Sequence, residues 1–105
     1  MKYDASCKDC ERLSSFLTQV KNKNPEYFCK PVPSFGKKTP PFLIVGLAPG
    51  MHGANRTGRP FTGDHAGILL YKTLYKFGFS NLETSQSADD NLILKNCSIT
   101  NAVKC

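Results

Sequence analysis

A short apolar run that leads into a glycine-rich loop constrains the fold of this chain more than any other feature of its sequence. The run covers residues 42–45, and prolines precede it. The loop that follows contains the glycines Gly46, Gly50, Gly53, Gly58, Gly63 and Gly67. Such a run is typical of a fully buried strand in an α/β sheet. Because ligands bind beyond the carboxyl ends of strands in these sheets, we expect a binding site in this loop.

A helix is expected on the N-terminal side of this strand. Ser6 is assigned as its N-cap, which places Cys7 and Cys10 in its first turn. Apolar residues at i, i+3, i+4 and i+7 predict one buried helix face, made of Leu13, Phe16, Leu17 and Val20. The helix should end before Pro25, and the five prolines within residues 25–41 predict an irregular crossing to the strand.

A second helix and a second strand are expected after the loop. Asp64 should cap a helix over residues 65–77 that is ended by Gly78. Its apolar side chains predict a buried face made of Ile68, Leu69, Leu70, Leu74 and Phe77. Residues 80–91 should form a polar surface loop, and residues 97–103 the second strand. Since two strands are few for a doubly wound sheet, we expect residues 1–105 to be the N-terminal part of a single longer domain.

Composition narrows the class of protein. With 105 residues, 40% of them hydrophobic, the chain can form one small domain. It shows no apolar run long enough to cross a membrane and no charged-then-apolar leader, so we expect a cytoplasmic monomer without a membrane partner. The net charge of +6 favours a polyanionic partner, although a soluble surface with no such partner is equally consistent with it.

The cysteines indicate a metal or redox site. There are five of them, Cys7, Cys10, Cys29, Cys97 and Cys105, and an odd number argues against a closed set of disulfides. Without a secretion signal, a Cys-x-x-Cys pair marks a metal, cluster or redox site more often than a disulfide. Cysteines three residues apart at a helix start project to the same side, where backbone N–H groups favour thiolate. Cys7 and Cys10 therefore predict a shared metal or cluster.

The glycine-rich loop does not match the common phosphate-binding patterns. It lacks both the lysine and Ser/Thr that close a P-loop and the G-x-G-x-x-G fingerprint. It does carry Arg56, Arg59, Phe61 and Asp64. Guanidinium groups fit phosphate oxygens, an aromatic face stacks on a base held outside a duplex, and a carboxylate assists bond cleavage at a sugar carbon. This combination predicts base excision, with a nucleotide-binding fragment as an alternative.

The run GLAPGMHGANRTGRPFTGD, residues 46–64, resembles the first signature motif of the uracil-DNA glycosylase superfamily, specifically of the family 5 (type b) enzymes related to the family 4 iron–sulfur enzymes. The segments KPVPSFG (30–36) and ITNAVKC (99–105) resemble the matching family segments, in the same order. The resemblance implies a three-layer αβα fold with a central parallel sheet, a [4Fe–4S] cluster, and hydrolysis of the N-glycosidic bond of uracil in DNA. Because Leu47 lies where family 4 has glutamate, it also implies activity on other deaminated bases.

The resemblance assigns three cluster ligands. Cys7, Cys10 and Cys105 match the family's cysteines, and the fourth is expected beyond Cys105. The family's second signature, a histidine-containing loop, has no match in the chain. We therefore expect this fragment alone to be inactive and the full-length protein to be active. Cys29 and Cys97 match no family role and are expected to be buried thiols.

The resemblance also implies the main site residues. Phe61 would stack on a flipped uracil, although it could instead anchor the loop in the core. Asp64 would position water or stabilise the sugar, although it could instead serve only as an N-cap. The base pocket would be completed by the backbone or side chains of Gly46, Ala48, Pro49, Gly50 and Asn101.

Other loop residues have two interpretations each. His52 and Asn55 would form the pocket wall or hydrogen-bond within the loop. Arg56 and Arg59 would contact DNA phosphates or rigidify the loop through carbonyl contacts. His65 would face solvent. The competing function is a non-catalytic iron–sulfur module that binds nucleic acid, which would hold a cluster but tolerate loss of the carboxylate and the stacking ring.

Overall fold

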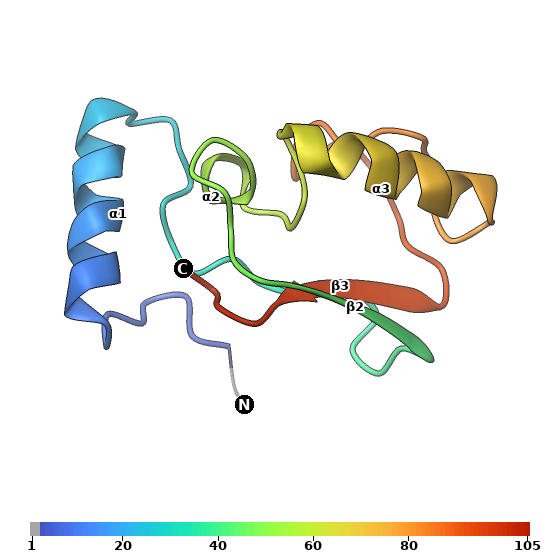
Figure 1. Ribbon diagram of the computed structural model, residues 1–105, viewed down its shortest axis with the longest axis horizontal. Coiled ribbons are helices and arrows are strands. Elements are labelled where there is room, and N and C mark those ends of the chain that lie inside the picture. Colours follow the sequence, from blue (N-terminus) through green and yellow to red (C-terminus); the bar gives the residue numbers. More distant parts are fainter. Residues whose placement is uncertain (1–2) are drawn as a thin grey trace.

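A three-stranded mixed sheet organises residues 3–105, which are the residues that the computed structural model describes. Its strands are β1 (Phe35–Gly36), β2 (Phe42–Gly46) and β3 (Cys97–Asn101), in the spatial order β1-β3-β2. The helices are α1 (Glu11–Lys23), α2 (Ala54–Thr57) and α3 (His65–Lys76). In Figure 1, α3 lies over the sheet, and α1 lies on the side of α2 that is away from α3. The mixed α/β class is confirmed.

Parallel pairing of β2 with β3 positions the glycine-rich loop. The two strands run in register from Phe42 opposite Cys97 to Gly46 opposite Asn101, so their carboxyl ends lie side by side. Both predicted strands are confirmed, with β3 ending earlier than predicted. The antiparallel strand β1 was not expected, because its two residues lie within the proline-rich crossing.

The hydrophobic core lies between β3 and α3. Its buried residues come from these two elements and from the segment that precedes β3: Tyr71, Leu74, Leu92, Leu94, Cys97 and Ile99. Burial raises the pKa of the Cys97 thiol, as expected for a thiol among apolar side chains. Cys97 is therefore a core residue, as its sequence context predicted.

Helix α3 begins and ends where predicted, but its buried face differs. The Asp64 carboxylate accepts a hydrogen bond from the Gly67 N–H at 3.2 Å. Gly78 follows the helix with a φ of +82°, the left-handed conformation that glycine favours. Leu74 is buried and Leu70 half-buried.

The prediction of a buried face was wrong for Ile68, Leu69 and Phe77, which are exposed. The core instead takes Tyr71, whose hydroxyl donates a 2.7 Å hydrogen bond to the Pro60 carbonyl. This bond satisfies the polar end of a fully buried side chain. The loop thus decides which side of α3 turns inward.

The predicted start of α1 was wrong. The helix begins at Glu11 with Cys10 as its N-cap, so Cys7 lies in the preceding segment. Ser6 does not cap it, because its N–H and hydroxyl both donate to Asp4 Oδ1, at 2.9 and 2.8 Å. Leu17 and Val20 are buried as predicted, but Phe16 is exposed. The helix ends at Lys23, before the proline, as expected.

The prediction that β2 is fully buried was also wrong. Leu43 is 52% exposed and Val45 58% exposed. Strand β2 forms one edge of the sheet, and its alternate side chains point to the face opposite the core. In the part of the chain that the structure describes, no helix covers this face (Figure 1). None of the described helices is long and apolar enough to cross a membrane.

The two faces of the sheet should respond differently to truncation. Ile99→Ala should lower the free energy of unfolding by about 2–5 kcal/mol, because it opens a cavity in the core. Val45→Ala, on the uncovered face, should cost about 1 kcal/mol or less. Urea denaturation of both variants measures the difference. Equal losses would contradict a core confined to the α3 side.

Candidate functional site

Three residues predicted for the base pocket meet at the carboxyl ends of β2 and β3. Gly46 and Asn101 are paired across the two strands. A Cβ on Gly46 would lie 2.8 Å from the Phe61 ring and even closer to Asn101 Oδ1. Only glycine therefore allows the ring and the amide to approach this strand end. The structure thus brings together residues that lie as far as 55 positions apart in the sequence.

Phe61 is held in a strained backbone conformation. Its φ of +53° lies in the left-handed region, which is unfavourable for an aromatic residue. The neighbouring peptides are fixed on both sides. The Tyr71 hydroxyl donates to the Pro60 carbonyl at 2.7 Å, and the Thr57 hydroxyl donates to the Thr62 carbonyl at 2.9 Å. The half-buried ring packs partly on the core, so the anchoring interpretation holds for part of its surface.

Asp64 lies against the same loop. One carboxylate oxygen caps α3, as the sequence suggested. The other faces the loop glycines, because a Cβ on Gly50 would lie 3.2 Å from Asp64 Oδ2 and a Cβ on Gly53 would lie 2.8 Å from Asp64 Cβ. Gly67 contacts both sides of the site, since a Cβ there would overlap the Phe61 carbonyl and lie 3.6 Å from Asp64 Oδ1. The Asp64 carboxylate therefore caps α3 with one oxygen and directs the other into the loop.

Asp64 also borders a cavity of about 480 Å³. The first residues of α3 form one wall of this cavity and residues 84–86 form another. His65, at the helix start, is exposed as expected. Ala48 and Gly50 lie at the loop surface, where their backbone is accessible, whereas Pro49 is half-buried.

Both arginines of the loop make internal contacts. Arg56 donates from Nε to the His52 carbonyl at 2.6 Å and from a terminal nitrogen to the Gly63 carbonyl at 2.7 Å. These bonds agree with the second interpretation, in which the guanidinium rigidifies the loop. Two of the five N–H donors of Arg56 thus hold the loop, and its contact with a DNA phosphate stays a prediction.

Arg59 is a buried residue rather than a surface cation. It pairs with Asp90 at 2.7 Å, and it donates to the Ser85 hydroxyl and the Ala88 carbonyl, each at 2.9 Å. Its guanidinium also stacks over the Phe35 ring, 4.3 Å from the centroid. The arginine therefore fastens the loop to residues 85–90 and to β1, and a phosphate contact does not fit this geometry.

The environment of Asp90, including its ion pair with Arg59, changes the pKa of its carboxyl group. Burial by itself raises the pKa of Asp90, but the hydrogen bonds from Arg59 and from the backbone N–H groups of Gln86 and Leu92 outweigh it. The net effect lowers the pKa of Asp90 below its ordinary value of 3.8. The carboxylate stays ionised well into the acid range.

His52 and Asn55 hydrogen-bond within the fold. His52 Nδ1 shares a 2.8 Å hydrogen bond with the Tyr27 hydroxyl, although the residue is otherwise exposed. Asn55 is buried, and its Nδ2 donates to the Met51 carbonyl at 3.3 Å and to Cys29 Sγ at 3.5 Å. Its Oδ1 is buried without a partner among residues 3–105. Both residues support the loop from the side of the proline-rich crossing.

Thiols from both ends of the chain face one region. Cys7 and Cys105 line a cavity of about 410 Å³ that Asn101 also borders. Burial raises the pKa of the Cys105 thiol, and the charges of Cys7 and Cys10 raise it further, so the three sulfur atoms lie within electrostatic range. The described residues nevertheless contain no group of three or more side chains arranged to hold a metal ion.

The donor chemistry of these three thiols fits an iron–sulfur cluster, but their number does not complete a four-cysteine set. Cys97 is in the core, as expected, whereas Cys29 is half-buried rather than buried and lines a cavity together with Cys7. The assignment of Cys7, Cys10 and Cys105 as cluster ligands stays a prediction.

Sequence reasoning missed the residues that hold the loop from outside it. Ser85 and Asp90 lie in the segment predicted as a featureless surface loop, yet they bind the Arg59 guanidinium. Ser85 also bonds the Thr62 hydroxyl at 2.6 Å. A single acidic residue in a polar stretch carries no local signal, because its partner is 31 positions away.

Comparison with known proteins identifies relatives of this chain. A family model described as "Uracil DNA glycosylase superfamily" matches residues 33–105. A protein named "Type-5 uracil-DNA glycosylase" from Mycobacterium leprae (strain TN) is 44% identical over 94% of this chain and 46% of its own length. Proteins of the same name from Thermus thermophilus and Pyrobaculum aerophilum are each 42% identical over 95% of this chain, and 48% and 46% of their own lengths. The chain thus spans less than half the length of these curated relatives.

Asp90→Asn should make the protein less stable at neutral pH and less sensitive to acid. The variant leaves the Arg59 guanidinium without its anionic partner, at a cost of about 1–3 kcal/mol. Because the folded-state pKa of Asp90 is lowered, its contribution is complete above pH 3.8 and is lost as the pH falls through the folded value. The difference in unfolding free energy between wild type and variant should therefore stay constant from about pH 7 to about pH 5 and shrink as the pH falls below about 4.

Urea denaturation across this pH range tests the expectation. Asp89→Asn is the matched control, since Asp89 is exposed and bonds only the Ser87 hydroxyl among the recorded contacts. If both variants show the same pH dependence, the Arg59–Asp90 pair does not fasten the loop.

Proposed function

The chain belongs to the uracil-DNA glycosylase superfamily, and from this premise we propose that the protein excises uracil from DNA by hydrolysing its N-glycosidic bond. The observation that carries the proposal is the contact of Phe61 with Gly46 and Asn101 at the strand ends. Asp64 lies beside this group, through Gly67. An aromatic ring and an amide thus lie together at the strand ends, and a carboxylate lies in the adjoining loop.

The base-binding part of the site matches the chemistry of an extruded pyrimidine. The Phe61 ring offers a face on which a flipped base stacks. The amide of Asn101 carries both donors and an acceptor, which suits the alternating edge of uracil. The exposed backbone at Ala48 and Gly50 supplies N–H groups toward the carbonyl oxygens of the base. Leu47 adds no hydrogen-bonding group, so we extend the proposal to other deaminated bases.

Asp64 is the group for the chemical step. Its Oδ2, directed into the loop, accepts a hydrogen bond from a water molecule and stabilises positive charge that develops on the sugar. Water adds to C1′ while the C–N bond breaks, and the base leaves as an anion with the bonding electrons. The proton that the water loses passes to Asp64 Oδ2 and from there to solvent or to the released base. Capping α3 with Oδ1 fixes the orientation of this carboxylate, so the structural and catalytic roles are compatible.

Cys7, Cys10 and Cys105 are the ligands that we assign to a [4Fe–4S] cluster, with a fourth thiolate from outside these residues. Their support is the shared cavity of Cys7 and Cys105 and the electrostatic coupling of all three thiols. When bound, the cluster supplies a covalent tie between the segment before α1 and the end of β3 rather than reaction chemistry.

The uncovered face of β2 supports a larger fold. Parallel sheets are normally covered on both faces, yet Leu43 and Val45 point to a face with no described helix. The relatives are about twice as long as this chain. We propose that the complete domain has three αβα layers and that further polypeptide covers this face and extends the sheet beyond β2.

Asp64→Asn separates catalysis from helix capping. Asparagine is as good an N-cap as aspartate, so the unfolding free energy should change by only about 0.5 kcal/mol or less. The loss of the carboxylate should slow uracil release by about 10²–10⁴-fold. The rate is measured on a labelled oligonucleotide with one uracil, using the full-length protein. Asp64→Ala should show the same loss of rate and an additional destabilisation of about 1 kcal/mol.

Unchanged uracil release by Asp64→Asn and Phe61→Ala would instead favour a non-catalytic iron–sulfur module that binds nucleic acid. No contact in the structure favours that alternative over the glycosylase.

Replacement of single cysteines tests the cluster. Cys7→Ser, Cys10→Ser and Cys105→Ser should each lower the iron and acid-labile sulfide per protein molecule, because each removes a thiolate ligand. Cys29→Ser is the matched control and should leave the iron content unchanged, since Cys29 lies beside Asn55. Iron loss in the control equal to that in the other variants would contradict the ligand assignment.

A further inference from the structure

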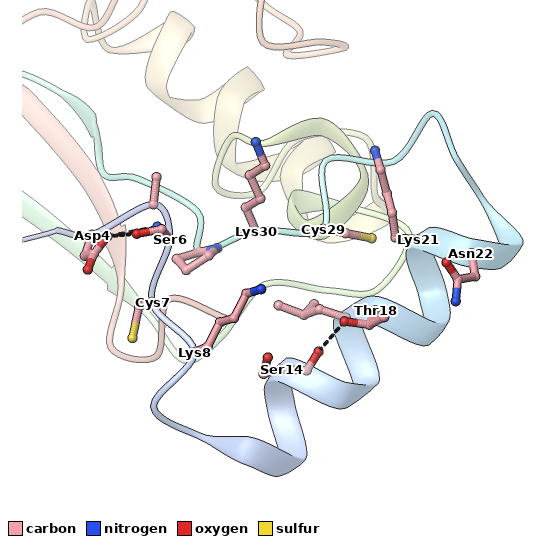
Figure 2. Close-up of a pocket in the computed structure, with 13 residues that line it drawn as sticks. Asp4, Ser6, Cys7, Lys8, Ser14, Thr18, Lys21, Asn22, Cys29 and Lys30 are labelled. Carbon is pink, nitrogen blue, oxygen red and sulfur yellow. Dashed lines mark hydrogen bonds between the residues drawn. The ribbon is translucent and has the colours of Figure 1, made fainter.

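A second cavity, which shares Asp4, Cys7 and Pro31 with the cavity beside Cys105, is bordered by three lysines. It has a volume of about 520 Å³ and lies between α1 and residues 29–31. Figure 2 shows lysines at its border from three different segments: Lys8 before α1, Lys21 near the end of α1, and Lys30 in the crossing. We refer to the space bordered by these three residues as the lysine cavity.

The charges of the lysine cavity are not neutralised by the protein. Asp4 is the one carboxylate that lines the cavity, and it accepts hydrogen bonds from the N–H and the hydroxyl of Ser6. Within residues 3–105 the recorded ion pair is Arg59 with Asp90, which leaves every lysine of the cavity without an acidic partner. Lys21 donates to the Tyr27 carbonyl, whereas Lys8 and Lys30 have no recorded hydrogen-bond acceptor in the described chain.

The remaining lining suits a phosphate attached to a sugar. Ser14 places a hydroxyl group on the α1 side, whereas the Thr18 hydroxyl donates to the Ser14 carbonyl at 3.1 Å (Figure 2). Leu17 and Pro31 add apolar lining. Ammonium groups and hydroxyls fit phosphate oxygens, and an apolar surface tolerates the carbon atoms of a ribose. The cavity is open to solvent at its lysines, which are exposed residues.

The wall of the lysine cavity is fastened to the loop that carries the candidate site. The Phe28 and Cys29 N–H groups donate to the Arg56 and Asn55 carbonyls, both at 3.0 Å. Asn55 Nδ2 also contacts Cys29 Sγ at 3.5 Å. Cys29 lines the cavity, so α2 joins the cavity wall to the glycine-rich loop. An anion in the cavity therefore has a fixed place relative to the base pocket.

We propose that the lysine cavity binds a backbone phosphate of DNA and acts as a second contact that holds the strand while a base occupies the pocket. The choice of DNA as the source of the phosphate rests on the proposed function. The contact is independent of sequence, because phosphates carry no base identity. It also adds phosphate-binding cations to those of the loop, where Arg59 is paired with Asp90 inside the fold.

The first test compares two charge-matched double variants of the intact protein. Lys8→Gln/Lys30→Gln removes two cavity charges and spares Lys21, which holds the turn at Tyr27. Lys72→Gln/Lys76→Gln removes two exposed charges from α3. Binding to a fluorescent oligonucleotide without uracil is measured from about 50 to about 200 mM salt.

The cavity variant should bind about tenfold more weakly, and the slope of log K against log salt should become shallower by about 1–2, corresponding to the lost phosphate contacts. The α3 variant should change affinity by about twofold or less. Equal effects of the two variants, or no effect of either, would overturn the proposal.

Cys29 reports occupancy of the cavity directly. The half-buried thiol lines it, so bound DNA should slow alkylation of Cys29 in the wild type but not in Lys8→Gln/Lys30→Gln, as read by peptide mapping. Inorganic phosphate alone is the second probe. Protection by phosphate without protection by DNA would indicate a site for a small anion and would overturn the proposal, as would protection by neither.

Uracil release distinguishes this inference from the proposed function. Below saturating DNA, the cavity variant should release uracil about tenfold more slowly, in line with its weaker binding, whereas the α3 variant should stay within about twofold of the wild type. If the wild type protects Cys29 on DNA but releases no base, the glycosylase proposal fails and the phosphate contact stands. If the wild type releases uracil but both lysine variants bind DNA equally, the phosphate contact fails and the glycosylase proposal stands.

Discussion

The buried guanidinium of Arg59 is the contact on which the arrangement of the candidate site depends. It ties the glycine-rich loop to Asp90, Ser85 and Ala88, and it stacks on Phe35 of β1. A buried charge without its partner is costly, so the loop and the 85–90 segment are stable only together. Ser85, which binds the Arg59 guanidinium, also hydrogen-bonds to Thr62. Thr62 directly follows Phe61, the residue with the strained backbone. The position of Phe61 therefore depends on side chains outside residues 46–64.

The parallel sheet supplies the second constraint. Pairing of β2 with β3 sets Gly46 opposite Asn101, and the absence of a Cβ at Gly46 admits the Phe61 ring. The same strand end leads to Cys105, whose thiol shares a cavity with Cys7 from the other end of the chain. The candidate base pocket and the cavity of Cys7 and Cys105 are consequently neighbours, with Asn101 bordering both.

Positive charge is divided between two uses in this molecule. The motif suggested the loop arginines as phosphate contacts. In the structure Arg56 donates hydrogen bonds to two carbonyls, and Arg59 forms an ion pair with Asp90. Arginine suits this internal role because its planar group fills several fixed hydrogen bonds at once. The lysines around the α1 cavity have no acidic partner among the described residues and retain their charge at the surface. The net charge of +6 is therefore carried mainly by lysines rather than by the signature loop.

The sequence by itself determined most of the local elements and named the candidate site residues. The cap at Asp64, the end of α3 at Gly78 and the strands at 42–46 and 97–101 follow from short-range patterns, because caps and periodicity act over a few residues. Only the tertiary structure decided which side of α3 is buried, that β2 is an exposed edge, and that Arg59 is internal. These depend on partners such as Pro60 and Asp90, which lie 11 and 31 positions from the residues they bind. Patterns within one segment carry no information about such distant contacts, so burial and charge pairing were settled by the packing of the whole chain.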